Sequence, residues 1–457
     1  MPIGADEKLC TPFIALHNLQ KIYGDRKGIL RHLSNAVEPV MPSRCREIEQ
    51  RIAEDIWSLP RLLVYQGDVA DLLEREGIDE KTVNEYGENV KSIYEELVKH
   101  GLAGDQALYQ AIWRPALCTD GDRRYLVIAS LATATVQALW IGNKNRFAVV
   151  VAEFINKAEA LSHSRIPHDV LVVSNTLSVL AMYASAKLAL EKLSPFLVLR
   201  PPSTMNPLYL ATFPQGIATW KTAERIKSVL ESNGVGMYPA MIIALVPSDD
   251  KTFVGEVVHT LIEGVHEAWR TMVDYVLDNY VRCSKEGSDG CGVNWGAKCM
   301  EGEKLGKIIE LVRRARNRPP YQYAVSATII DKGELLKQGA TRHRGLWGHV
   351  VEVYTEGHEG ASLSKYVWAP LYSVEDLERD RIRGVNKLCT NCYQLISVVE
   401  VQAESSVTGK ALPCRAGRLA LKAREKLCVY CLINRLLENP FTVVFKSFAT
   451  PRPTTGG

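Results

Sequence analysis

The chain has 457 residues, of which 46% are hydrophobic and 23% charged, the composition of an ordinary globular protein. This length exceeds what one hydrophobic core can organise and suggests about three domains. The formal net charge of only +3 excludes a uniformly basic nucleic-acid-binding protein, so contact with nucleic acid would have to come from local clusters.

The amino terminus and the apolar segments give no sign of export or of a membrane span. The first residues lack the basic and then apolar pattern of a signal peptide, and the apolar run at 126–139 is short and interrupted by Ser, Thr and Gln. We therefore expect a cytoplasmic protein without membrane contact, in a reducing compartment where paired cysteines bind metal more often than they form disulfides. Hyperthermophiles are the exception, and Cys283, Cys291 and Cys299 are candidates for such bridges.

Residues 1–118 are predicted to form a helical domain. Apolar residues recur at helical spacing around 48–59 and 90–102, and no strand-like alternation precedes position 123. A metal-dependent nuclease of the His-Asp type needs several histidines and an adjacent His-Asp pair. This segment has only His17, His32 and His100 and no such pair, so we expect either a degenerate His-Asp-type domain or a different fold.

Residues 119–385 alternate between strand and helix. The predicted elements are a strand at 125–136, helices at 143–161 and 173–193, strands at 196–200 and 240–246, a long helix at 254–276 and a strand at 321–330. This order predicts a βαββαβ sheet of the ferredoxin-like, palm type, with helices on one face and the other face open to a partner or ligand. The Gly- and Cys-rich segment 283–302 is predicted to be an inserted loop. The fold class is therefore α+β.

Two Cys-x-x-Cys pairs, separated by 35 residues, are the most specific motif: Cys389 with Cys392, and Cys428 with Cys431. Four thiolates presented by two tight turns form a closed tetrahedral cage for Zn²⁺. We predict a structural zinc in a segment at 386–440, followed by a tail at 441–457. The alternatives are unligated thiols or two redox pairs, although the strand–helix context of a thioredoxin-like motif is missing.

The second cysteine pair lies in a basic stretch. Its members Arg415, Arg418, Lys422 and Arg424 are predicted to contact nucleic acid, since basic side chains displace counterions from a phosphate backbone. A second basic cluster occupies 313–318. The alternative for either cluster is a solvated helix face. Cys414 lies among the basic residues without a second cysteine, so we exclude it from the metal site.

Motifs for catalysis are missing. The sequence contains no P-loop and no Gly-Gly-Asp-Asp, and the nearest phrases, at 119–122 and 288–290, lack the hairpin context of a nucleotide-cyclising palm. Phosphoryl transfer requires metals held by clustered carboxylates. We therefore do not expect catalysis by this chain alone.

Six phrases resemble the motifs of one family and occur in the same order along the chain. The most specific are KLCTNC at 387–392 and EKLCVYCLINRL at 425–436, which hold the cysteine pairs and Arg435. The others are TATVQALWIGNKNR at 133–146, DVLVVSNTLS at 169–178, FLVLRPPSTMNPLY at 196–209, and YPAMIIALVP at 238–247 followed by Trp269. The chain resembles, over roughly 105–440, the large subunit of type III CRISPR RNA-guided effector complexes, most closely the Cmr-type (III-B) branch. Two departures are the loss of Gly-Pro before Val136 and of a tryptophan after Asp169.

The resemblance implies a first palm that supplies half of an ATP-binding cleft. In that case Ser174 and Ser178, on one helix, would offer hydroxyls to the nucleotide; alternatively, both are small residues that ease helix packing. The resemblance also implies guide RNA, target RNA and other CRISPR effector subunits as partners. The family's second palm, which carries the acids that make cyclic oligoadenylates, has no counterpart here, nor do its nuclease residues.

Three hypotheses follow. The first is a scaffold subunit of an antiviral ribonucleoprotein that binds zinc, guide RNA and neighbouring subunits. The second is half of a cyclic-oligoadenylate synthetase, completed by a separate chain that bears the missing palm. The third is a stand-alone, zinc-dependent nucleic-acid-binding protein unrelated to CRISPR.

Overall fold

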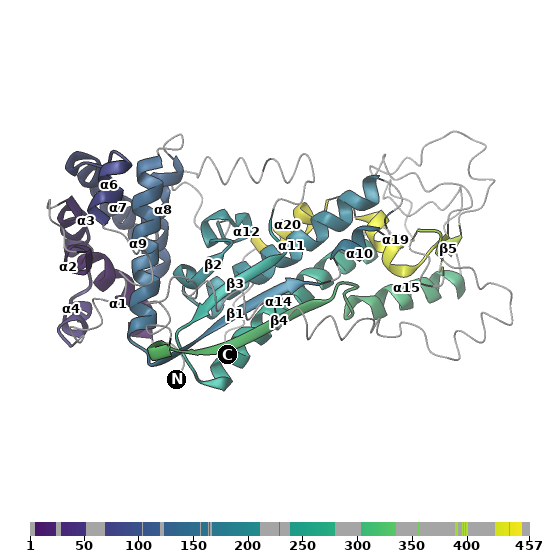
Figure 1. Ribbon diagram of the computed structural model, residues 1–457. Coiled ribbons are helices and arrows are strands. Elements are labelled where there is room, and N and C mark those ends of the chain that lie inside the picture. The colour runs from purple at the N-terminus through teal and green to yellow at the C-terminus, as the bar shows by residue number, and fades with distance from the viewer. Residues whose placement is uncertain are drawn as a thin grey trace.

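The computed structural model has helices at one end, a sheet in the middle and the cysteine segments at the other end (Figure 1). It describes residues 5–23, 29–51, 69–102, 104–118, 123–155, 157–162, 164, 167–210, 228, 238–278, 303–334, 355, 389–391, 395, 397, 399–400, 426–437 and 439–449. The predicted insertion at 283–302 and the basic stretch at 415–424 lie outside these residues.

The described part of residues 5–118 is mostly helical, with turns between the helices. The helices are α1 (Ala5–His17), α2 (Leu19–Tyr23), α3 (Ile29–Val37), α4 (Ser43–Glu49), α6 (Val69–Arg75), α7 (Glu80–Lys99) and α8 (Gly104–Cys118), with a 3-10 turn at Glu38–Val40. α7 shows why they form: Asp79 caps its first turn by accepting from the Thr82 amide at 2.8 Å. Its inward stripe is Val83, Tyr86, Val90, Tyr94 and Leu97.

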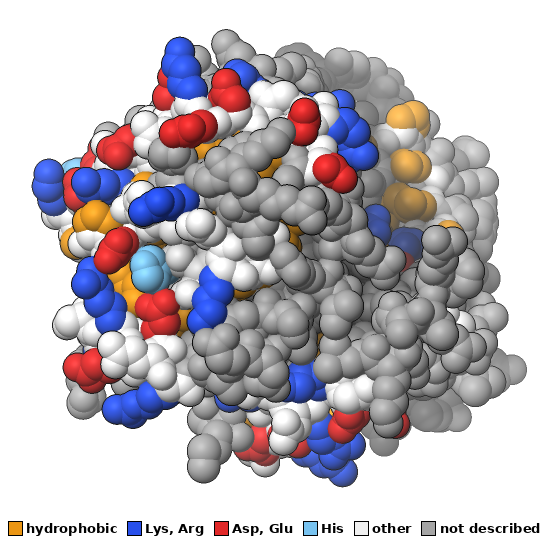
Figure 2. All heavy atoms as spheres, turned by 60° about the vertical axis from the view of Figure 1, so that its left-hand side comes forward, with side chains coloured by type: hydrophobic (Ala, Val, Ile, Leu, Met, Phe, Trp, Pro, Cys, Tyr) orange, Lys and Arg blue, Asp and Glu red, His pale blue; other side chains and the backbone are white. Residues whose placement is uncertain are grey.

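The surface of this helical end carries both signs of charge. Figure 2 shows Lys and Arg side chains interspersed with Asp and Glu over the described part of this face. This mixture agrees with the small net charge of +3. Over the described part of the face in this view, neither sign of charge predominates.

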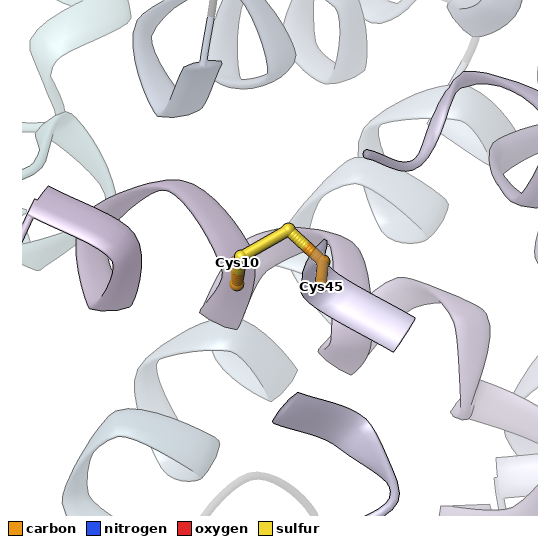
Figure 3. Close-up of a disulfide and its surroundings, with 2 residues drawn as sticks. All are labelled: Cys10 and Cys45. Atoms are coloured by element: carbon orange, nitrogen blue, oxygen red, sulfur yellow. A yellow bond between two sulfur atoms is a disulfide. The ribbon is translucent and has the colours of Figure 1, made fainter. Parts of the chain in front are cut away.

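A disulfide between Cys10 and Cys45 ties α1 to α4 (Figure 3). Both cysteines are buried, at 1% and 0% exposure. The bridge departs from our expectation that cysteines in this protein bind metal rather than pair, and it does not involve the cysteines that we considered as candidates for bridges. No spacing motif marks two cysteines 35 positions apart, so only the packing of the helices brings them together.

The predicted strand at 125–136 is wrong. These residues belong to the helix α9 (Arg123–Gly142), which packs on α1 and α8. Buried residues recur at 125, 128, 129, 132, 135, 136 and 139, the period of a helix. Val136 and Gln137, from the first family-like phrase, both lie inside α9, where Gln137 donates to the Phe196 carbonyl at 2.7 Å.

The predicted helix at 143–161 is also wrong, because β1 (Arg146–Phe154) occupies the middle of this span and a separate short helix, α10 (Lys157–Ser162), follows. Every residue from Phe147 to Phe154 is buried. A strand that is covered on both faces reads as a continuous apolar run, which cannot be told from a buried helix by periodicity. The second face that we expected to be open is therefore covered along β1.

The remaining palm elements lie close to where they were predicted. They are α11 (Pro167–Glu191), β2 (Val198–Arg200) after a 3-10 turn (Pro195–Leu197), β3 (Met241–Val246), α14 (Lys251–Val276), α15 (Glu303–Arg316) and β4 (Tyr323–Asp331). A 3-10 turn (Ser203–Met205) and α12 (Pro207–Leu210) follow β2. The four strands form one antiparallel sheet in the order β2-β3-β1-β4. The chain order β1, α11, β2, β3, α14, β4 is the predicted βαββαβ sequence.

Helices α11 and α14 pack tightly on each other and both contact the sheet, so they lie on the same side of it. Their closest approach is at Gly264, where a Cβ would come within 2.7 Å of Ala184 Cα. Only glycine lets the two backbones meet at this distance. The predicted apolar stripe of the long helix is confirmed, with Val257, Leu261 and Trp269 at 0% exposure.

Two helices, α9 and the part of α11 at Asp169–Glu191, are long and apolar enough to cross a bilayer, contrary to our expectation that no span is long enough. The apolar windows of these helices are 72% and 83% buried inside the protein. Such burial is typical of core helices.

The chain ends in two helices after the second cysteine pair. They are α19 (Val429–Leu436) and α20 (Pro440–Ala449). α20 packs on α11 and α14 through Phe441 and Val444, although the sequence assigned its residues to a tail. Asn439 caps this helix by accepting from the Phe441 amide at 3.0 Å, directly before Pro440, so the sequence does carry a helix-start signal here. The surface of α11 and α14 supplies the burial.

A polar seam joins the helical end to the palm, between α8 and the segment after α11. Gln106 donates to the Ala189 carbonyl at 2.9 Å and accepts from the Tyr209 hydroxyl. The Tyr109 ring lies edge-on to Phe196, with the ring centroids 4.8 Å apart. Tyr109, Phe196 and Tyr209 are buried and Gln106 is half-buried, so these contacts join the two parts at a largely dry surface.

Asp105, in the first turn of α8, lies at this seam with one carboxylate oxygen, Oδ2, that has no hydrogen-bond partner. Burial raises the pKa of its carboxyl, against the opposing influence of the Ser194 hydroxyl and the Lys8 ammonium. Asp79 behaves in the opposite way, because its hydrogen bonds from Thr82 lower its pKa.

These opposite shifts give the same substitution opposite effects. A carboxyl with a raised pKa destabilises the protein as pH rises through that pKa, so Asp105→Asn should stabilise it at pH 7 by on the order of 1 kcal/mol. Asp79→Asn should lower stability at pH 7, because a lowered pKa contributes stability that is lost on acidification. The effect of Asp105→Asn on stability should vanish below the ordinary carboxyl pKa of 3.8. The effect of Asp79→Asn should vanish below the lowered pKa of Asp79. Urea unfolding between pH 3 and 8 measures them, and the same sign at both sites would contradict the assignment.

Candidate metal centre

Three of the four predicted zinc ligands come together in space. The sulfur atoms of Cys389, Cys428 and Cys431 all lie within 4.8 Å of one another. Two are fully buried and Cys431 keeps 9% exposure. Cys392, the fourth predicted ligand, lies outside the described residues. The structure therefore brings together sulfurs from both Cys-x-x-Cys pairs, although 35 residues separate the pairs in the sequence.

The second pair forms a knuckle at the start of α19. Cys428 is the N-cap residue, and its sulfur accepts a hydrogen bond from the Cys431 amide at 3.5 Å. A sulfur in this position caps the helix as an Asp or Ser oxygen would. An amide donor also stabilises the negative charge of a thiolate, the form that binds metal.

The first pair is attached to the second by backbone contacts around Thr390. The Thr390 amide donates to the Lys426 carbonyl at 2.8 Å, and its hydroxyl accepts from the Lys426 amide at 3.1 Å. Two short strands, β5 (Val399–Glu400) and β6 (Lys426–Leu427), pair beside this contact. This ladder holds the two knuckles beside each other, so their thiols form one donor set.

The donor chemistry fits zinc. Thiolates bound to one Zn²⁺ at about 2.3 Å lie roughly 3.8 Å apart, and the observed upper limit of 4.8 Å allows this after small adjustments. Soft sulfur donors in a buried, closed arrangement select zinc over magnesium or calcium. A redox pair would need an exposed thiol, whereas Cys389 and Cys428 are at 0% exposure. The cluster therefore supports a structural metal site, and of the two alternatives it disfavours redox chemistry.

Helix α19 joins this centre to the core of the palm. The Tyr430 hydroxyl donates to the Arg318 carbonyl at 2.7 Å, and its ring lies 6.2 Å from that of Trp269. Burial raises the pKa of the Tyr430 phenol, which keeps it protonated as a donor. Asn434, which lies on the same helix, accepts a hydrogen bond from the Tyr321 hydroxyl at 3.4 Å.

A buried ion pair fixes the other end of α19. The Arg435 guanidinium donates two hydrogen bonds, both at 2.7 Å, to the two carboxylate oxygens of Asp169. The side chains are 1% and 2% exposed. Asp169 lies in the first turn of α11, which begins six residues before the predicted helix at 173–193. Sequence reasoning placed both residues in family-like phrases, but nothing in a single sequence signals that they pair across 266 positions.

The two serines predicted to contact a nucleotide lie on α11, four residues apart. Ser178 is 6% exposed and donates to the Tyr238 carbonyl at 3.0 Å. This bond ties α11 to the segment that enters β3, which favours the packing role that the sequence left open. Ser174 is half-buried. Their contact with a nucleotide remains a prediction.

The basic residues divide between described and undescribed segments. Arg415, Arg418, Lys422 and Arg424, predicted to contact nucleic acid, lie outside the described residues. The second cluster forms the end of α15, which packs against α19. In it, Arg314 pairs with Glu310, and Arg316 with Asp274 at 2.7 Å, so much of its charge is locally compensated.

No protein-family model and no curated protein matches the sequence. Among solved structures, the fold is similar to a chain of the "Type III-B Cmr-beta Cryo-EM structure of the Apo state", with a TM-score of 0.59 and 14% identity over 96% of this chain and 52% of that chain. The second similar structure is a chain of the "Cryo-EM structure of the Type III-B Cmr-beta bound to cognate target RNA". Its TM-score is 0.46, with 14% identity over 83% of this chain and 42% of that chain. The predicted Cmr-type resemblance is confirmed as a likeness of fold. The chain spans about half the length of the chains that it matches.

The metal site predicts a zinc content of about one per chain when the protein is purified without added metal. Cys428→Ser should lower this content by at least tenfold, because it removes a ligand and the N-cap sulfur of α19 together. Cys414→Ser, in the same basic stretch but outside the predicted ligand set, is the matched control and should leave zinc unchanged. Inductively coupled plasma mass spectrometry measures both, and a zinc-free wild-type chain would refute the site.

Proposed function

We propose that the chain is the large-subunit component of a Cmr-type (III-B) CRISPR effector complex. It acts there as a cytoplasmic scaffold that binds zinc, guide RNA, target RNA and neighbouring subunits. The observation that carries this proposal is the fold similarity over 96% of the chain to part of a Cmr-beta complex. The cysteine cluster adds a second and independent argument, since the family-like phrases at 387–392 and 425–436 are the ones that meet in space.

The architecture suits a scaffold. Its three parts are a helical unit, a palm-type sheet and a small zinc module, and buried polar contacts lock them to one another. Parts that are fixed in this way present surfaces in a constant geometry to several partners. Contact with RNA is proposed for the basic stretch at 415–424, which directly precedes β6 and the second cysteine knuckle in the chain.

Charge reversal tests the RNA contact. Replacing Arg418, Lys422 and Arg424 by glutamate should weaken binding of single-stranded RNA and reduce the slope of log K against log salt by about 2, since each lost phosphate contact contributes about 0.7. Reversal of Lys81, Lys91 and Lys99 on α7 changes the net charge equally and should have a much smaller effect. Fluorescence anisotropy at several salt concentrations gives both numbers. If the two triple variants have equal effects, the residues at 415–424 do not contact RNA and form a solvated surface.

The palm-type sheet also allows the second hypothesis, that the chain is half of a cyclic-oligoadenylate synthetase. If the chain holds at most half of an ATP cleft, the purified chain should make no oligoadenylate from ATP with Mn²⁺, since the residues for metal-bridged phosphoryl transfer are not expected in it. Mass spectrometry of the products measures this. Activity that appears only on addition of a second, Gly-Gly-Asp-Asp-bearing chain would favour a split synthetase, and activity of this chain alone would contradict both readings.

A further inference from the structure

We infer that the Asp169–Arg435 ion pair makes the start of α11 depend on the metal centre, so that loss of the metal releases the first turns of the helix that carries Ser174 and Ser178. The inference rests on the zinc site of the proposed function and is independent of the proposed RNA contact. It assigns Asp169 and Arg435 a positioning role.

The first step is the dependence of α19 on the metal. α19 has only 8 residues, too few for a helix to be stable on its own. Cys428 caps it and Cys431 lies in its first turn, so a metal bound by these sulfurs would fix the first turn directly. Without a metal, the thiols or thiolates would lie close together in a buried, apolar environment. Because burying such groups without a partner costs free energy, loss of the metal favours opening of this turn.

The second step connects the metal to Arg435, which follows Cys431 by one helical turn. Both N–H···O bonds to Asp169 are 2.7 Å long, and a planar guanidinium can make both only from one orientation. A shift of α19 therefore breaks the bidentate geometry. It would leave two buried charges without adequate partners, which the protein can relieve only by letting water in.

The third step is the weak anchoring of the start of α11 apart from this pair. Val170 and Leu171, which directly follow Asp169, are each 38% exposed, whereas Val172 and Leu177 are 1% and 4% exposed. The apolar burial that holds the helix thus begins after its first turn. Among the first residues of α11 whose side chains the structure describes, Asp169 enters the interior and pairs with Arg435, so losing Arg435 should fray α11 from this end.

Hydrogen exchange of the full chain tests this dependence. Removing zinc with a chelator should speed amide exchange in peptides covering 167–174 at least tenfold, while peptides from α7 keep their rates. Asp169→Asn should retain about one zinc per chain, yet exchange fast at 167–174 with or without metal.

The matched control is Asp274→Asn, which breaks a second bidentate Arg–Asp pair in the same region. Arg316 and Asp274 are 39% and 42% exposed, so water can replace either partner. This variant should keep the wild-type response of α11 to chelation. If Asp169→Asn does not fold, Arg435→Lys, which keeps the charge but loses the fork, replaces it and should give the same fast exchange.

Three results would overturn the inference. Chelation that removes zinc and leaves exchange at 167–174 unchanged refutes the coupling, while the zinc site itself stands. Acceleration of all peptides, α7 included, shows that the metal stabilises the whole chain instead of this end of α11. A chain that neither contains nor takes up zinc refutes the coupling together with the metal site.

Discussion

A buried ion pair holds the helix with two of the clustered cysteines to the sheet domain of this protein. Arg435 and Asp169 are almost completely shielded from water, and charges in such a place are tolerated only when each satisfies the other. The pair therefore allows one position of α19 relative to α11. Since α19 also carries two of the clustered cysteines, the cysteine module is part of the core of the palm and not an appendage on a linker.

Helix α11 is the element that both ends of the molecule share. Its first turn holds Asp169 against α19, and near its last turn the Ala189 carbonyl accepts from Gln106 of the helical unit. Between these points it packs on α14 at the Gly264–Ala184 contact. A rigid helix fixed at both ends transmits a displacement at either one, because packed cores shift as units and do not deform continuously. This connection gives the scaffold proposal a physical basis.

The likeness to a chain of a Cmr-beta complex concerns the fold, at 14% identity. At that identity the side chains that do chemistry need not be shared, so function must be argued from the residues of this chain. The cysteine cluster is one place where the fold similarity, the local geometry and the donor chemistry agree. The Cys10–Cys45 bridge, in contrast, belongs to the helical unit, where our reading of the sequence expected reduced thiols. Intracellular proteins of hyperthermophiles do contain such bridges, so the disulfide is compatible with the proposed cytoplasmic location.

Local sequence patterns determined several features directly. The apolar stripe of α14 repeats with a helical period, β3 is a short apolar run between turn signals, and two Cys-x-x-Cys pairs specify metal ligands by chemistry alone. These features depend on neighbouring residues, so a single sequence reveals them. The order of strands and helices followed in the same way, although the positions assigned to the first strand and first helix were exchanged.

Tertiary structure decided the rest. β1 is buried at every residue from Phe147 to Phe154, which erases the polar positions that distinguish a period of 2 from one of 3.6, whereas α9 shows its helical period of burial once its packing on α1 and α8 is known. The partners of Cys10, of Asp169 and of Gln106 lie 35, 266 and 83 positions away, respectively. Such pairings are selected by the packing of whole elements, because a buried charge or amide is stable only where another element brings a complementary group. The sequence therefore specified which residues could bind a metal, and the packing of distant elements decided which of them meet and what they hold in place.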